Sequence, residues 1–333
     1  MAEAVQTEAR KLPYVAAITE GVRTVMREQE NAFVAGEDVA GAGGVYGYYN
    51  GILDEFGPER VFDTPISEEG IVGLGVGAAA TGCRPIIDLM FMDFLGECMD
   101  EVANQLAKMR YMFGGAATLP VTMLTMAGAG MSLAAQHSQS LEAWICHLPG
   151  LKVVMPTTPY DAKGLIIEAA RDDNPVIVVL NKASLALQGE VPEESYTVPL
   201  GEANIIRPGT NYTIVALGRM TQEAMKAAKK LQELGIDAEV IDPRSLQPFD
   251  TQTVVNSLKK THRAMVVHEA VRFGGIGGEI AAQLQEEAFD YLDAPIARVG
   301  APFSPVPFSP ALEKHYVPNA DRIVAEARKQ LGV

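Results

Sequence analysis

Short apolar runs rich in β-branched residues alternate with longer amphipathic segments along nearly the whole chain. Runs that are apolar on both faces predict strands of a buried parallel sheet, and the amphipathic segments predict helices that cover it. In the first half, Thr158 is the predicted N-cap of a helix that opens with a proline. The predicted strands there are NAFVAG, RPIIDL, PVTMLT, LKVVMP and NPVIVVL, and the predicted helices include Phe94–Phe113 and Pro159–Arg171.

The alternation stops at residues 187–209, where LQGEVPEESYTVPLGEANIIRPG has three prolines, several acids and little helical periodicity. We therefore predict two α/β domains with doubly wound, mostly parallel sheets, at residues 1–186 and 207–333, joined by a linker at 187–206. The proline-rich APFSPVPFSP predicts an extended segment before the last helix. The predicted elements of the second half are NYTIVALG, DAEVIDP, RAMVVHE and APIARVG as strands, with helices at Met220–Leu234, from Gly277 onward and at Asp321–Leu331.

Composition narrows the class of protein. The 333 residues are 48% hydrophobic and 21% charged, which is typical of a globular protein, and the net charge of −15 argues against a nucleic-acid or anionic-membrane surface. The three cysteines are far apart and form no C-x-x-C pair, which indicates a reducing compartment rather than a disulfide frame or a zinc site. The N-terminus has neither a signal-peptide nor a transit-peptide pattern, so we expect a cytoplasmic protein.

The stretch DTPISEEGIVGLGVGAAATG allows two interpretations. Gly73, Gly75 and Ala78 match the G-x-G-x-x-A spacing of a dinucleotide-binding turn, with Asp88 as a downstream acid. However, the preceding SEEGIV is poor material for the central strand that this turn requires. We therefore favour a buried helix in which small residues allow close packing, and keep a nicotinamide-binding dehydrogenase domain as the alternative. Small residues recur at helical spacing at Gly70, Gly73, Gly77 and Thr81.

Two titratable residues are candidates for chemistry. Glu68 follows DTPIS, where Ser67 or Thr64 could cap a helix; Glu68 and Glu69 would then favour the helix dipole from its first turn. That structural role explains Glu69, but for Glu68 a catalytic role is an equal alternative. His137 follows the glycine-rich MAGAGM and is either a proton carrier or a histidine that bonds nearby backbone. No Walker, H-E-x-x-H, G-x-S-x-G or G-D-G segment is present, so the residues alone leave the site undetermined.

Several segments, in the same order and with similar spacing over nearly the whole chain, resemble a known family. It is the beta subunit of the thiamine-diphosphate-dependent 2-oxoacid dehydrogenases, which include acetoin, pyruvate and branched-chain members. The resemblance implies a pyrimidine-binding domain followed by a transketolase-type C-terminal domain, with acetoin dehydrogenase the most similar member. The segments are VFDTPISEEGIVGLGVGAAATGCRPI, LMFMDF, NQLAKMRYMFGG, QHSQSLEAW, HLPGLKVVMPTTPYDAKGL, RDDNPVI and APFSPVPFSP.

The resemblance implies half of an active site. Thiamine diphosphate would lie between this chain and an alpha subunit, which would hold the diphosphate through Mg²⁺ with the G-D-G motif that is absent here. The assembly would be an α2β2 heterotetramer attached to a lipoyl acyltransferase core. Its small-molecule substrate would be acetoin, pyruvate or a branched 2-oxoacid, with the acyl group passed to lipoamide. A non-catalytic scaffold subunit that has kept the fold remains a further alternative.

The resemblance also assigns roles to residues. Glu68 would share a proton with the pyrimidine ring nitrogen of the cofactor, and burial would raise its pKa for that task. His137 would be the active-site histidine near the lipoyl entrance. The chain departs from the family at Asn181–Lys182–Ala183–Ser184, where many members have a glutamate-lysine-tyrosine pattern. Residues flanking the pyrimidine would be Ile66, Met90 and Phe94, and ligands of a potassium ion found in some members would be Leu119, Val121, Thr122, Asp172 and Asn174.

Overall fold

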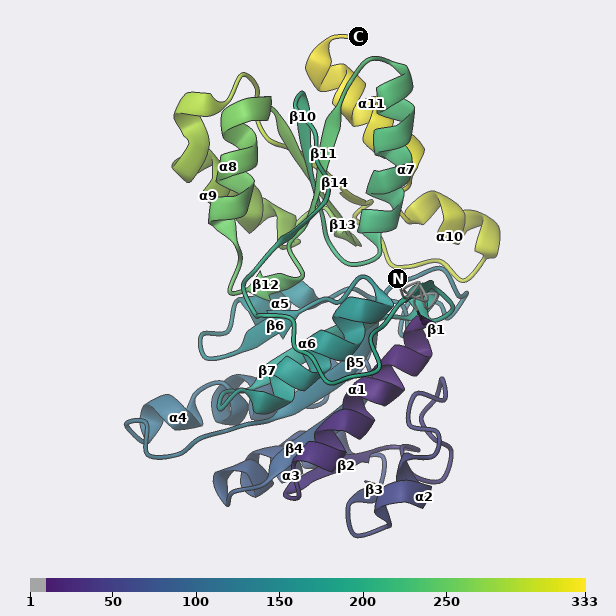
Figure 1. Cartoon of the computed structure of the whole chain (residues 1–333), viewed down its shortest axis with the longest axis vertical. Helices are drawn as coiled ribbons and strands as arrows, with labels where there is room; N and C mark the ends of the chain where they lie inside the picture. The colour runs from purple at the N-terminus through teal and green to yellow at the C-terminus, as the bar shows by residue number, and fades with distance from the viewer. Residues whose placement is uncertain (1–9) are drawn as a thin grey trace, which may run out of the picture.

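A computed structural model describes residues 10–333 as two α/β units, one above the other along the long axis of the molecule (Figure 1). Each unit has a sheet covered by helices, which confirms the predicted fold class. The first nine residues of the predicted first domain lie outside the described part. Within residues 10–333, no helix is both long and apolar enough to cross a membrane.

The first unit contains a seven-stranded sheet in the order β12-β6-β7-β5-β4-β2-β3, parallel except for β12. Ile86 and Ile87 of β4 belong to different core clusters, because successive side chains of a strand point to opposite faces of the sheet. Helices α1 and α6 pack on the Ile86 side, and α3 packs on the Ile87 side. The strands of this sheet are β2 (Ala32–Gly36), β3 (Val61–Asp63), β4 (Arg84–Phe91), β5 (Thr122–Ala127), β6 (Lys152–Val154), β7 (Val176–Asn181) and β12 (Ser245–Gln247).

The predicted helix after Thr158 is confirmed in its bounds and its cap. The Thr158 hydroxyl accepts a hydrogen bond from the Asp161 amide at 3.1 Å, which satisfies one of the free N–H groups at the helix start. This helix is α6 (Pro159–Arg171). The other helical elements of this unit are α1 (Tyr14–Glu28), α2 (Ile52–Phe56), α3 (Glu68–Ala80), η1 (Met92–Gly96), η2 (Glu101–Leu106), α4 (Met109–Met112), α5 (Glu142–Cys146) and η3 (Lys182–Ser184).

The prediction of one helix at Phe94–Phe113 is wrong. The segment forms a 3₁₀ turn, a π-helix and a short α-helix in succession. Tertiary contacts override the helical periodicity here: Asp93 accepts bonds from Gln139, and Arg110 donates to Asn174 at 2.7 Å. Asp93 and Arg110 are thus bonded to segments far away in the sequence, and such tertiary contacts can outweigh a local helical pattern.

The glycine run lies inside α3, so Gly73, Gly75 and Ala78 do not form a dinucleotide-binding turn. The predicted helix is confirmed, but the glycine that packs closely is not among the small residues predicted at helical spacing, Gly70, Gly73, Gly77 and Thr81. Gly75 is the buried glycine: a Cβ there would lie 3.1 Å from Ile87 of β4. Gly73 faces Glu101 of η2, and Gly77 faces open space. The close approach is therefore between helix and strand.

The second unit has a five-stranded sheet in the order β14-β13-β10-β11-β9, in which β9 is antiparallel. Residues 191–203 of the predicted linker contain no helix or strand, but Gln188–Glu190 pairs with Lys11–Pro13. These two short strands are β1 (Lys11–Pro13) and β8 (Gln188–Glu190). The elements of the second unit are β9 (Asn204–Arg207), β10 (Tyr212–Ala216), α7 (Met220–Glu233), β11 (Ala238–Asp242), α8 (Thr251–Thr261), β13 (Ala264–Val271), α9 (Gly277–Ala288), η4 (Phe289–Tyr291), β14 (Ala297–Ala301), α10 (Pro310–Tyr316) and α11 (Ala320–Leu331).

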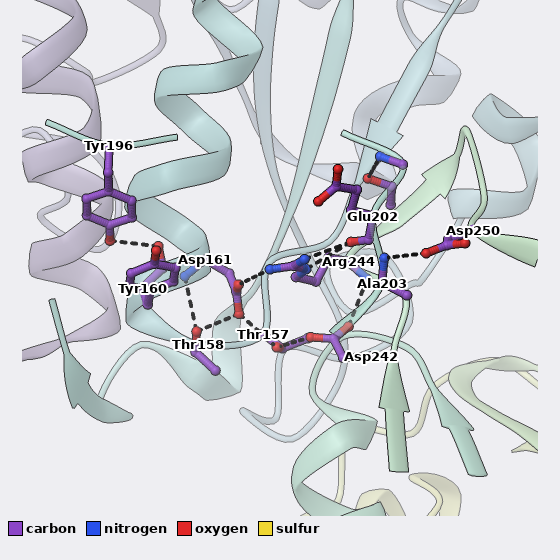
Figure 2. A network of polar contacts seen from close by, with 12 residues as sticks. Thr157, Thr158, Tyr160, Asp161, Tyr196, Glu202, Ala203, Asp242, Arg244 and Asp250 are labelled. Carbon is purple, nitrogen blue, oxygen red and sulfur yellow. Dashed lines mark hydrogen bonds and ion pairs between the residues drawn. The ribbon is translucent and has the colours of Figure 1, made fainter. Parts of the chain in front are cut away.

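The two units are joined by a strand and by buried polar contacts. Strand β12 follows the second unit's β11 yet completes the first sheet (Figure 1). Beside it, Arg244 forms an ion pair with Asp161 at 3.5 Å, and Thr157 donates a hydrogen bond to Asp242 (Figure 2). Burial, followed by the charge of Asp161, raises the pKa of Asp242 to about 8. These contacts fix the second unit against the carboxyl edge of the first sheet.

Candidate active site

The predicted site residues gather at one edge of the seven-stranded sheet. Strands β2, β3, β4, β5 and β7 are mutually parallel, so the segments that follow them all emerge at the same edge. Ligands bind at such carboxyl edges in open α/β sheets. The chain that follows these strands carries, in order, Glu37, Glu68, Phe94, His137 and Lys182.

Glu68 is the first residue of α3 and is half-buried, whereas Glu69 beside it is exposed. Ser67 occupies the N-cap position, but its side chain makes no capping bond. Burial, followed by the negative charge of Glu68, raises the pKa of Glu37, whose Oε1 is buried and lacks a partner within the described residues. The Glu37 carboxyl, buried next to the charge of Glu68, therefore holds its proton more readily than a free carboxyl group does. Ile66, two residues earlier, is 84% exposed.

Met90 lies at an irregular end of β4. Its φ is +59°, an uncommon conformation for a residue with a side chain, and the register with β5 shifts between Asp88 and Phe91. The Asp88 carboxylate stabilises this turn by accepting a bond from the Met90 amide at 2.5 Å and another from the Tyr48 hydroxyl at 2.7 Å. Such strain at a strand end is a common feature of binding sites.

His137 packs between two aromatic rings. Phe91 and Phe94 contact the imidazole edge-on, with ring centroids 5.2 and 5.5 Å from that of His137. Cys98 donates a weak bond to the Phe94 carbonyl, and burial, followed by the charge of Glu68, raises the pKa of the Cys98 thiol to about 12. Phe94 therefore links His137 to Cys98, which lies near enough to Glu68 to be affected by its charge. Phe91 was absent from the predicted set, although it lies directly before the predicted Phe94 segment.

The segment that carries His137 is held in place by carboxylates rather than by secondary structure. We call residues 128–140, which contain no helix or strand, the His137 loop. Glu269 accepts a bond from the Ala129 amide at 2.6 Å, and Glu313 accepts one from the Gly130 amide at 2.7 Å. Asp93 accepts a bond from the Gln139 amide at 3.1 Å. Two of these carboxylates come from the second unit, so the loop is anchored across the junction. A cleft of about 330 Å³ opens beside it, between the loop and the 303–306 segment.

Sequence reasoning missed these supporting residues. Glu269 ends the predicted strand RAMVVHE, and Lys182 is the second residue after NPVIVVL, so a polar residue at the carboxyl end of a buried strand was the available signal. Asp93 and Glu313 lie in the short helical elements η1 and α10, and no pattern in the sequence pairs them with backbone amides 46 and 183 residues away.

Glu142 predicts a pH dependence of folding stability. Burial raises its pKa to about 7, and its Oε2 has no partner within residues 10–333. Between the unfolded-state pKa of about 4.3 and pH 7 the folded chain holds a proton that the unfolded chain has lost, so stability falls as pH rises. In Glu142→Gln we expect this fall, measured by urea unfolding at pH 5 and pH 8, to shrink by about 1–3 kcal/mol. An unchanged pH dependence would contradict the assignment.

The predicted potassium ligands lie close together, at the start of β5 and after α6. The Leu119 amide bonds to the Asp173 carbonyl at 3.2 Å, and the Thr122 hydroxyl is buried without a partner among the described residues. However, Lys152 already pairs with the Asp172 carboxylate, and Arg110 donates to Asn174. The Leu119 and Val121 carbonyl oxygens accept backbone hydrogen bonds from Val121 and Val176. The Thr122 hydroxyl is thus the one predicted side-chain ligand that has no partner among the described residues.

Comparison with known proteins identifies both units. The family "Transketolase, pyrimidine binding domain" matches residues 10–188, and "Transketolase, C-terminal domain" matches residues 201–323. "Acetoin:2,6-dichlorophenolindophenol oxidoreductase subunit beta" of Bacillus subtilis (strain 168) is 48% identical over 97% of this chain and 98% of that protein. The protein of the same name from Cupriavidus necator is 47% identical over 97% of this chain and 98% of that protein.

Two further relatives extend this similarity. "Pyruvate dehydrogenase E1 component subunit beta" of Bacillus subtilis (strain 168) is 44% identical over 96% of this chain and 99% of that protein. The solved structure "Split gene transketolase, inactive beta4 tetramer" superposes with a TM-score of 0.78 at 25% identity, over 96% of this chain and 98% of that one. The chain is thus similar over nearly its full length to beta subunits from two kinds of dehydrogenase.

Proposed function

The chain belongs to the family of beta subunits of thiamine-diphosphate-dependent dehydrogenases, and from that premise we propose that it forms the pyrimidine-binding half of an acetoin- or 2-oxoacid-cleaving active site. The observation that carries the proposal is the convergence of Glu68, Met90, Phe94 and His137 at one edge of the sheet, next to an almost fully exposed Ile66.

Glu68 is the proposed proton-holding group. Bound thiamine diphosphate supplies an electron sink for cleaving the bond next to a carbonyl group. The Glu68 carboxyl, at the start of α3 and close to Glu37, would hold a proton against the pyrimidine ring nitrogen. Met90, Phe94 and Ile66 would flank the ring with backbone and apolar contacts. Closure of this edge by another subunit would exclude water and strengthen the effect of the carboxyl group.

An alpha subunit is the proposed closing partner. Ile66 is 84% exposed in this chain, as expected of an apolar group that another subunit covers. The chain lacks the G-D-G segment, so the Mg²⁺ and the diphosphate would be held by that partner in an α2β2 heterotetramer. The related split-gene transketolase is named as an inactive beta4 tetramer, which agrees with a beta chain that needs a partner for activity. A lipoyl acyltransferase core would receive the acyl group.

A potassium ion would have a structural role. The carbonyl groups of Leu119, Val121 and Thr122, with the unpartnered Thr122 hydroxyl, would supply its oxygens, near Asp172 and Asn174. Such an ion would tie the connection between α6 and β7 to the start of β5, at the end of these strands opposite the proposed site.

The proposed function is tested by a dye-reduction assay on the chain co-purified with its alpha partner, in thiamine diphosphate and Mg²⁺. Acetoin, pyruvate and a branched 2-oxoacid are compared in parallel. The similarity to two acetoin-oxidising beta subunits leads us to expect acetoin to be the preferred substrate. An intact, cofactor-loaded complex that turns over none of the three would instead support a non-catalytic scaffold.

His137 is proposed to assist proton transfer when the acyl group passes to the lipoyl acceptor. In His137→Ala we expect lipoyl acylation to fall by about 10²-fold, because a positioned general acid or base contributes on that scale. Dye reduction, which omits the lipoyl step, should fall much less. The exposed His315 on α10 provides the control, and His315→Ala should leave both rates unchanged. Equal loss of both rates in His137→Ala would contradict the assigned step.

A further inference from the structure

Lys182 is a buried ammonium group directly behind His137. It is 1% exposed and lies at the carboxyl end of β7, in the segment where the sequence departs from the family pattern. Its Nζ donates a hydrogen bond to the carbonyl oxygen of His137 and lies 4.9 Å from the ring centroid of Phe91. Phe91 is also one of the two rings that contact the imidazole. Lys182 therefore contacts both the backbone of His137 and the Phe91 ring, against which the His137 imidazole packs.

The charges around Lys182 are those that hold the His137 loop. Burial lowers the pKa of Lys182 to about 8, against the opposing effect of three nearby carboxylates. These are Asp93, Glu269 and Glu313. Each of the three also accepts a backbone N–H of the His137 loop. The positive charge of Lys182 thus compensates the negative charges of the three carboxylates that bind the His137 loop.

The His137 loop needs such ties because its backbone is strained. Ser132 and Ala134 have φ of +56° and +60°, a region that residues with side chains seldom adopt. Residues in such conformations persist only where surrounding contacts over-determine them. Asn181 contributes to this restraint: it caps the η3 turn through the Ala183 amide and donates to Glu269 at 3.0 Å. Asn181 thus ties the end of β7 to one of the carboxylates that hold the His137 loop.

We propose that Lys182 is a positioning residue that sets the placement of the His137 imidazole, through the His137 carbonyl and the Phe91 ring. The proposal rests on the proposed function of His137 in acyl transfer. It specifies that Lys182 acts on the acyl-transfer step and not on activation of the cofactor by Glu68. Loss of the ammonium group would release the His137 carbonyl and leave the three carboxylates to repel one another.

The test compares two rates in the same preparation of the assembled complex: dye reduction, and acylation of free lipoamide. In Lys182→Met, which keeps the length but removes the donor, we expect the ratio of acylation to dye reduction to fall about tenfold, because small misplacements of a reacting group have effects of that order. In the double variant with His137→Ala, we expect no further fall beyond that of His137→Ala alone. The ratio is independent of the amount of folded complex. If Lys182→Met does not assemble, Lys182→Leu, which also lacks a donor, replaces it.

Lys163 offers a matched control. It too is 1% exposed, donates to the carbonyls of Pro192, Glu193 and Glu194, and lies 5.3 Å from the Tyr196 ring centroid, and none of these contacts is with the His137 loop. Lys163→Met should destabilise the chain without changing the ratio. An unchanged ratio in Lys182→Met, or additive losses in the double variant, would overturn the proposal. If His137→Ala itself leaves acylation intact, the assigned role of His137 fails instead.

Discussion

Turnover by the assembled complex is expected to fall by about 10²- to 10⁴-fold in Glu68→Gln, because the amide keeps the size of the side chain but cannot hold an exchangeable carboxyl proton. The position of Glu68 at the start of α3, near Glu37 and the predicted pyrimidine contacts, is the reason for this size of effect. The measurement is initial-rate dye reduction with the preferred substrate at saturating cofactor. Subunit assembly, followed by gel filtration, should be unchanged.

Glu69 provides the matched control for charge and helix dipole. It lies in the same first turn of α3 but is exposed, so Glu69→Gln removes the same charge from the same helix end. Its loss should change stability by no more than about 0.3–1 kcal/mol and leave turnover near the wild-type rate. If the two variants lose activity to the same extent, the effect belongs to the helix terminus and the assignment of Glu68 is wrong.

The largest expected loss of stability follows Gly150→Ala. Gly150 has φ +108°, and a Cβ there would overlap the carbonyl oxygen of Ala107 and lie 2.9 Å from its carbonyl carbon. Both obstacles are backbone, which cannot rotate away. Backbone strain and steric overlap together predict a destabilisation of about 3–5 kcal/mol. Urea unfolding of the variant, monitored by circular dichroism, measures this change.

Gly82 separates the two causes. Its φ is +101°, close to that of Gly150, but no atom of residues 10–333 other than its own chain neighbours lies within 4 Å of the position its Cβ would take. Gly82→Ala should therefore show the conformational effect alone, about 1–2 kcal/mol. Similar destabilisation of the two variants would mean that the contact between Gly150 and Ala107 is not as close as described.

Regular elements of the fold could be predicted from the sequence because their signals are local. The buried strand Val176–Asn181 is a continuous apolar run, and the Thr158–Pro159 pair marks a helix start that the structure reproduces. The segment from Met92 to Met112 could not be predicted in this way. Its shape depends on distant partners such as Gln139 and Asn174, which no local window contains.

The same division holds for the site. Glu68 and His137 could be singled out as candidates because they lie in family motifs, and both follow strands that end at the same edge of the sheet. The residues that bond to the His137 loop could not be predicted from the sequence. Lys182 was noticed only as a departure from the family, and Glu269 not at all, because their importance comes from neighbours across the junction of the two units.

The most direct test of the role of Glu68 is the exchange of the thiazolium proton of bound thiamine diphosphate with D₂O, followed by quenched NMR in the assembled complex. This rate needs no knowledge of the substrate and reports only on activation of the cofactor. We predict exchange far faster than in the free cofactor for the wild-type complex and for Glu69→Gln, and a rate close to that of the free cofactor for Glu68→Gln. Equally fast exchange in Glu68→Gln would show that Glu68 does not activate the cofactor.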